Sequence, residues 1–118
     1  MTDVSTIAKG DGSGVSAPRR IVVRDDRAWR ALWSEDAGTS AAAPPVDFDT
    51  QMVAAVFAGD RPTPGYGVEI TGVRRDGDTL DVVVSESRPA PGMMAAQVIV
   101  APFHIVALPR FEGQVSFV

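Results

Sequence analysis

Few side chains in this sequence could carry out chemistry, and they stand far apart. His104 is the only histidine, cysteine is missing, and no serine lies in a G-x-S-x-G turn that would present a nucleophile. A zinc site would need further histidine or cysteine ligands. His104 lies between Phe103 and Ile105, which is typical of a histidine in the core or at a strand edge. The sequence therefore predicts that the protein is not an enzyme. The opposite reading would require His104 to be exposed beside a nucleophile.

Paired carboxylates and a glycine-rich turn are the other candidate binding groups. Asp47 and Asp49 supply fewer oxygen ligands than a cation site needs. Asp76 and Asp78 belong to a predicted exposed turn. The stretch 10–14 (GDGSG) lacks the Lys-Ser/Thr ending of a phosphate-binding loop, and no helix pattern follows it. We expect neither a metal nor a cofactor.

Length, composition and charge exclude several classes of function. The chain has 118 residues, of which 45% are hydrophobic and 22% charged, so we expect one core-forming domain over 1–118, with 1–14 as a flexible N-terminal strand and loop. A net charge of −4 offers no phosphate-neutralising surface, and a nucleic-acid partner is not expected. No window reaches the ~20 apolar residues that span a bilayer. The beginning of the chain carries no signal-peptide pattern, so the sequence indicates a soluble protein of undetermined compartment.

One helix is predicted among elements that otherwise indicate strands. Asp25 or Asp26 is a suitable N-cap, and Gly38 is a suitable residue to end the helix. Its apolar positions form one stripe at helical spacing: Trp29, Leu32 and Trp33. Strands are expected at 4–9, 15–24, 52–58, in the two arms of a hairpin that turns at 75–77, and at 95–101, 103–108 and 114–118. These elements predict an α+β fold: an antiparallel β-sandwich or open barrel of about seven or eight strands, with one α-helix packed by its tryptophans.

The hairpin decides which loops meet. Gly77 can supply the left-handed conformation of a three-residue turn over 75–77. That turn pairs the apolar positions of the two strands, Val68, Ile70 and Gly72 with Val84, Val82 and Leu80. The same register places Tyr66 opposite Glu86. Loops at 59–65 and 87–94 must then leave the sheet at the end opposite the turn.

These two loops have the composition of a recognition surface. Prolines stiffen loops and lower the entropy lost on binding, while arginine, tyrosine and methionine are enriched in interfaces. We interpret them as a partner-binding surface, and proline-rich turns without a function are the alternative. The residues assigned to this surface are Arg61, Pro62, Thr63, Pro64, Gly65, Tyr66, Arg88, Pro89, Met93 and Met94.

Four segments resemble a known family. In chain order from about Arg20 they read VVRDDRAWRALW, VDFDTQMVAAVFAGDRPTPGYGVEITGV, SESRPAPG and VAPFHIVALP. They are similar to the bacterial PrcB-like domain, the C-terminal domain of a protease-complex subunit, and the resemblance implies a non-catalytic subunit that binds or stabilises a protease. Arg61, Gly65 and Tyr66 belong to the matched motif, whereas Pro64 stands where such domains often carry a second glycine. The lipoprotein cysteine and signal of exported members are missing here, so the resemblance suggests the cell envelope or secretion only for a longer precursor.

Two functions follow as expectations. The leading hypothesis is a protein-binding domain that modulates a bacterial protease through the two loops. The alternative is a small-ligand-binding domain whose pocket lies between the helix and the sheet, near Trp29, Trp33 and Tyr66.

Overall fold

Two stacked sheets and one helix make up the computed structural model, which describes residues 4–38, 42–62, 64–90 and 98–118. In chain order the elements are β1 Ser5–Gly10, β2 Arg19–Val23, α1 Asp26–Ala37, β3 Gln51–Phe57, β4 Gly67–Asp76, β5 Thr79–Ser87, β6 Phe103–Pro109 and β7 Gln114–Phe117. One sheet has the antiparallel order β1-β6-β3-β2. The other has the order β4-β5-β7, in which β7 runs parallel to β5. The predicted α+β sandwich of about seven strands with one helix is confirmed, without a closed barrel, and the parallel β7 makes the smaller sheet mixed.

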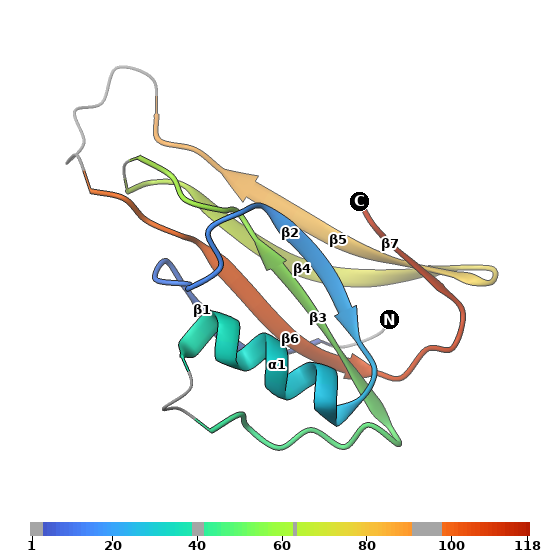
Figure 1. Ribbon diagram of the computed structural model, residues 1–118. Helices are drawn as coiled ribbons and strands as arrows, with labels where there is room; N and C mark the ends of the chain where they lie inside the picture. Colours follow the sequence, from blue (N-terminus) through green and yellow to red (C-terminus); the bar gives the residue numbers. More distant parts are fainter. Residues whose placement is uncertain (1–3, 39–41, 63, 91–97) are drawn as a thin grey trace.

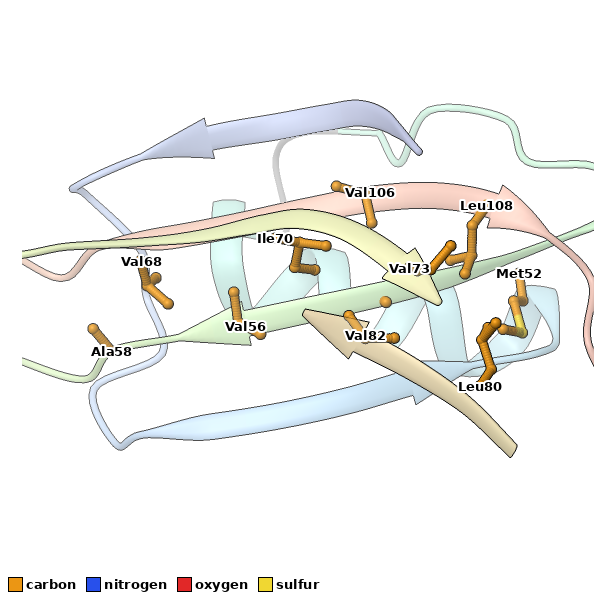
Figure 2. Packing of buried hydrophobic residues seen from close by; sticks show 11 residues of the cluster. Met52, Val56, Ala58, Val68, Ile70, Val73, Leu80, Val82, Val106 and Leu108 are labelled. Carbon is orange, nitrogen blue, oxygen red and sulfur yellow. The ribbon is translucent and has the colours of Figure 1, made fainter. Parts of the chain in front are cut away.

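The layers are stacked in the order helix, four-stranded sheet, three-stranded sheet (Figure 1). Strand β3 lies inside this stack, and because strand side chains alternate, both of its faces are buried. The side chains of β3 that pack with the helix are Val53, Ala55 and Phe57. Those that pack with β4 and β5 are Met52, Ala54 and Val56 (Figure 2). Burial on both sides explains why this strand is an uninterrupted apolar run in the sequence.

Helix α1 begins and ends where the sequence predicts. The backbone N–H of Ala28 donates to Oδ1 of Asp25 over 2.8 Å, so Asp25 is the N-cap. Gly38 ends the helix with φ of 87°, and its N–H donates to the carbonyl of Ser34. Trp29 is fully buried against the four-stranded sheet. Burial of such a side chain contributes about 2 kcal/mol to the free energy of unfolding.

The β4–β5 hairpin differs from the predicted register. The turn contains only Gly77 and Asp78, since Asp76 pairs with Thr79, and Gly77 has the expected positive φ of 62°. The predicted three-residue turn was therefore wrong. A β-bulge at Thr71, between Ile70 and Gly72, shifts the register again, and the predicted Tyr66–Glu86 pairing was wrong because Glu86 pairs with Val68. The observed pairs are Val68 with Glu86, Ile70 with Val84 and Val73 with Val82. Because the bulge adds one residue, Ile70 and Val73 both face the core although they are three apart (Figure 2).

The prediction of a strand at 95–101 was also wrong for residues 98–101, the part of this range that the structure describes. Residues 95–97 lie outside the described part of the chain, and Val98 and Ile99 are exposed by 54% and 71%. Val100 and Ala101 form only isolated bridges, to Arg61 and Gly12. Strand β6 already pairs along the whole of β3, from Phe57–Phe103 to Gln51–Pro109. Residues 98 and 99 therefore lie beyond the end of the sheet. The strand predicted at 15–24 is likewise shorter, Arg19–Val23.

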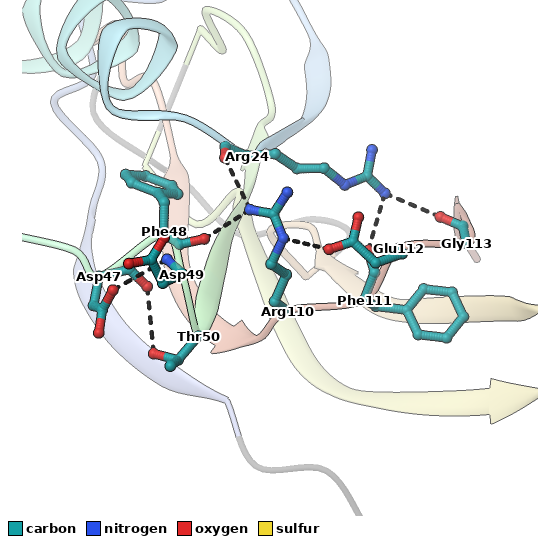
Figure 3. Close-up of polar contacts among 9 residues, drawn as sticks. All are labelled: Arg24, Asp47, Phe48, Asp49, Thr50, Arg110, Phe111, Glu112 and Gly113. Carbon is teal, nitrogen blue, oxygen red and sulfur yellow. Dashed lines mark hydrogen bonds and ion pairs between the residues drawn. The ribbon is translucent and has the colours of Figure 1, made fainter.

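Two arginines hold the crossing from β6 to β7, where the chain passes between sheets (Figure 3). Arg110 donates to the carbonyls of Phe48 (2.7 Å) and Arg24 (3.2 Å), and it pairs with Glu112. Arg24 donates to the carbonyl of Gly113 over 3.0 Å. These bonds connect the end of β2, the segment before β3 and the segment before β7. They fix the point from which β7 enters the smaller sheet in parallel with β5.

Candidate partner-binding site

The described parts of both predicted loops, residues 59–62, 64–65 and 87–90, lie at one end of the molecule, opposite the tip of the β4–β5 hairpin (Figure 1). Gly65 of the first loop packs closely against Pro89 of the second. A Cβ built on Gly65 would lie only 3.0 Å from Cγ of Pro89. The φ of Gly65 is 105°, a conformation that side chains disfavour. The expectation that the loops meet is confirmed despite the different register. We call residues 59–62, 64–66 and 87–90 the loop edge.

Arg61 is held rigidly in the loop edge. Its N–H donates to the carbonyl of Val100 over 2.7 Å, and its carbonyl accepts from the N–H of Val100 over 2.9 Å. The guanidinium lies over the ring of Tyr66, with Cζ 5.4 Å from the ring centroid. Nε of Arg61 is buried and has no hydrogen-bond partner among the described residues. The backbone bridge anchors the main chain of Arg61, and its guanidinium packs on the ring of Tyr66.

A hollow of about 230 Å³ opens beside Arg61. Its lining residues come from the ends of β3, β4 and β5 and from the two loops: Ala58, Arg61, Tyr66, Gly67, Glu86, Ser87 and Arg88. Two arginines and one glutamate therefore border one small space. We call it the arginine hollow.

The structure brings five of the ten predicted site residues together. Arg61, Tyr66 and Arg88 line the arginine hollow, and Gly65 and Pro89 join the loops beneath it. The exposed prolines of the first loop are Pro62 and Pro64. Thr63, Met93 and Met94 lie outside the described residues.

Two exposed apolar residues beside this site were missed by the sequence analysis. Val98 and Ile99 precede Val100, whose backbone bonds to Arg61, so they lie next to the first loop. Their apolar character predicted burial. No signal in the sequence alone indicates their exposure, because it depends on where the pairing of β6 with the seven residues of β3 ends, and 98–99 fall outside that span.

His104 is a core histidine, as predicted, with an exposed fraction of 3%. The N–H of Ile70 donates to its Nδ1 over 2.9 Å, and Oγ1 of Thr6 lies 2.8 Å from its Nε2. Because Nδ1 is an acceptor, neutral His104 carries its proton on Nε2 and donates to Thr6. It therefore has no free lone pair with which to take the proton of that hydroxyl. Burial, followed by the nearby charge of Lys9, lowers the pKa of His104, and Glu69 opposes this shift.

The ligand pocket predicted between helix and sheet does not bring its three aromatic residues together. Trp29 is fully buried and donates from Nε1 to the carbonyl of Pro44 over 2.8 Å. Tyr66 lies in the loop edge. Trp33 alone borders a second hollow, of about 480 Å³, between α1 and the segment 42–46. This helix hollow is lined by the helix and its following segment, not by the sheet.

Within the described residues, no three histidine or acidic side chains are grouped so that they could hold a metal ion. The helix found there is too short and too polar to cross a membrane.

Fold and site define a small α+β domain with two stacked sheets and a surface where two loops meet. The family model described as PrcB C-terminal matches residues 52–109, and this stretch of the chain belongs to that family. The matched stretch begins at the second residue of β3 and ends with the last residue of β6, so it contains the loop edge. Strands β1, β2 and β7 and helix α1 lie outside it. No curated protein and no solved structure gives a significant match.

Proposed function

We propose that this domain is a non-catalytic protein-binding module that contacts its partner through the loop edge. The observation that carries the proposal is the Arg61–Tyr66 pair, in which Cζ of Arg61 lies 5.4 Å from the ring centroid. The backbone of Arg61 also bonds to Val100, which follows the exposed Val98 and Ile99 in the chain. Arginine and tyrosine are frequent among the residues that dominate binding energy. Groups already fixed in the free protein lose little entropy when a partner binds.

The partner we propose is a bacterial protease, which the domain binds, stabilises or modulates. Support for this choice comes from the family model, which is described as PrcB C-terminal, together with the resemblance of the sequence to the C-terminal domain of a protease-complex subunit. The loop edge lies within the matched stretch 52–109. A role for the loop edge in that association is thus consistent with where the family similarity lies.

Affinity capture from the native organism's extract and culture medium tests this proposal. The baits are the wild type, an Arg61→Ala/Tyr66→Ala/Arg88→Ala variant, and an Arg74→Ala/Arg75→Ala variant altered near the opposite end of the same hairpin. We expect the wild type and the Arg74/Arg75 variant to retain a protease and the loop-edge variant to lose it. All baits are checked for folding by circular dichroism. Equal capture by all three would assign the loop edge a purely structural role.

Binding of a small ligand in the helix hollow is the second candidate. It is favoured by Trp33, which borders this hollow and whose Nε1 is buried without a hydrogen-bond partner among the described residues. A ligand with an acceptor could satisfy that N–H. Such a ligand should change tryptophan emission in the wild type and leave a Trp33→Phe variant unchanged.

A further inference from the structure

The arginines of this domain differ in whether they have an internal anionic partner. Arg19, Arg30 and Arg74 each form an ion pair with an acidic side chain. Arg61 and Arg88 form none with any residue in the part of the chain that the structure describes, although they border the same hollow. Two arginine side chains that line one small space carry like charges, and an anion bound between them would offset their repulsion.

Arg61 is also partly dehydrated. Its Nε is covered by protein and makes no hydrogen bond to a described residue, so one side of the guanidinium has lost water without gaining an acceptor. The ring of Tyr66 covers one face of the group. Electrostatic attraction is stronger in such a low-dielectric setting than in water. An anion that reaches the remaining N–H groups of Arg61 would therefore be bound more strongly than at a fully hydrated surface arginine.

The arginine hollow favours an anion with one negative charge. Glu86 borders the same space, so the local charge is two cations against one carboxylate. A second negative charge on the ligand would be repelled by Glu86. The volume of about 230 Å³ admits a small planar group, and planar carboxylates match the donor geometry of guanidinium groups.

We propose that the arginine hollow binds a single carboxylate of the protein partner, held between Arg61 and Arg88. This inference rests on the proposed function, because it names the chemical group that the loop edge recognises. The carboxylate can belong to an aspartate or glutamate side chain or to the C-terminus of the partner. Both sources present the same planar anion, and they are separated by the choice of probe.

Nuclear magnetic resonance titration of the ¹⁵N-labelled domain tests the proposal without a known partner. The probes are acetyl-Gly-Glu-Gly-amide, with a side-chain carboxylate, acetyl-Gly-Gly, with a C-terminal carboxylate, and acetyl-Gly-Gln-Gly-amide, which is neutral. We expect the Nε–H signal of Arg61 and the amides of the loop edge to shift with one or both carboxylates and not with the neutral peptide. Equal shifts with the neutral peptide, or no shift with any probe, would overturn the proposal.

Charge variants make the test specific. Arg88→Gln should weaken carboxylate binding about fivefold, as expected for the loss of one exposed charge pair. Glu86→Gln should strengthen it by a similar factor, since the repelling charge is removed. Arg74→Gln, at the other end of β4, should leave it unchanged. Binding that is insensitive to both Arg88→Gln and Glu86→Gln would contradict a site in this hollow.

The two proposals can fail separately. If the loop-edge variant loses protease capture but the wild-type domain binds neither carboxylate probe, the loop edge remains the contact surface and the carboxylate site is refuted. Carboxylate binding with unchanged capture would support the site and refute its use in recognising the protease.

Discussion

The backbone N–H of Ile70 donates a hydrogen bond to Nδ1 of His104 over 2.9 Å, which joins the outer strand of one sheet to the interior of the other. Nε2 of the same ring lies 2.8 Å from Thr6 of β1. One imidazole therefore connects β1, β4 and β6. This arrangement requires the neutral ring, because Nδ1 must accept.

Stability should consequently depend on pH through His104. Burial lowers its pKa in the folded state below the ordinary value of 6.5, so the unfolded chain binds a proton more readily than the folded one. The contribution of His104 is fully present above about pH 6.5 and is lost as the pH falls from there towards the folded pKa. We expect the free energy of unfolding, measured with urea, to decrease from pH 7.5 to 5.5.

A His104→Gln variant is the matched control, because its side-chain oxygen can still accept from Ile70 and does not titrate. Its unfolding free energy should change less with pH over this interval than that of the wild type. Identical pH profiles would show that another group causes the dependence. Lys9 and Glu69 are the charged groups that influence the histidine, and their ion pair is exposed.

Burial of Asp36 predicts an opposite dependence. Asp36 has an exposed fraction of 7% in the last turn of α1, its Oδ1 has no partner among the described residues, and burial raises its pKa above 3.8. A carboxylate there also faces the negative end of the helix dipole. Ionisation therefore destabilises the fold, and this loss sets in as the pH rises from about 3.8 through the folded pKa.

Asp36→Asn should raise the free energy of unfolding by about 1 kcal/mol at pH 7. The hydrogen bond from Ser13 can be kept by the amide oxygen. The gain should shrink as the pH falls through the raised folded pKa of Asp36, because the wild-type carboxyl then becomes neutral. Destabilisation at pH 7 would mean that the ionised form makes a stabilising contact.

Gly65 should tolerate no side chain. Its φ of 105° and the closeness of Pro89, 3.0 Å from a built Cβ, predict that Gly65→Ala lowers the free energy of unfolding by about 1–2 kcal/mol. Gly12→Ala is the control, since no atom of the described residues lies within 4 Å of a Cβ there. Similar urea midpoints for the two variants would argue against packing of the loops through Gly65.

Removal of the exposed apolar pair should affect binding and not folding. Val98→Ser/Ile99→Ser alters side chains exposed by 54% and 71%, so the free energy of unfolding should change by no more than about 0.5 kcal/mol. Capture of the partner should decrease. Val118→Ser, at a residue exposed by 52% at the end of the chain, should leave capture intact. Equal capture by the two variants would remove Val98 and Ile99 from the contact surface.

Local patterns predicted the helix and the hairpin strands, but not the details that depend on distant contacts. The N-cap Asp25 and the end at Gly38 are set within a few residues, and both are confirmed. The bulge at Thr71 is not set by its neighbours in the sequence. A three-residue turn without a bulge would also point Ile70 inward, so the local pattern does not distinguish the two registers. In the structure the bulge lies next to the N–H of Ile70 that donates to His104, a residue 34 positions away.

The candidate site shows the same difference between features set by nearby residues and features set by distant contacts. Meeting of the two loops follows from the antiparallel hairpin alone, so Arg61, Tyr66 and Arg88 could be placed together from the sequence. Exposure of Val98 and Ile99 could not, because it depends on where the pairing of β3 with β6 ends. An apolar run indicates burial only when a partner strand is long enough to cover it.

Site-specific photocrosslinking tests most directly that the loop edge is the contact surface. A benzoylphenylalanine replaces Pro62, which is exposed in the first loop, or Asp78, which is exposed in the hairpin turn at the opposite end. Each variant is irradiated in the native extract, and crosslinked proteins are identified by mass spectrometry. The proposed function predicts a crosslink to a protease from position 62 and none from position 78. A protease crosslinked from position 78 and not from position 62 would contradict it.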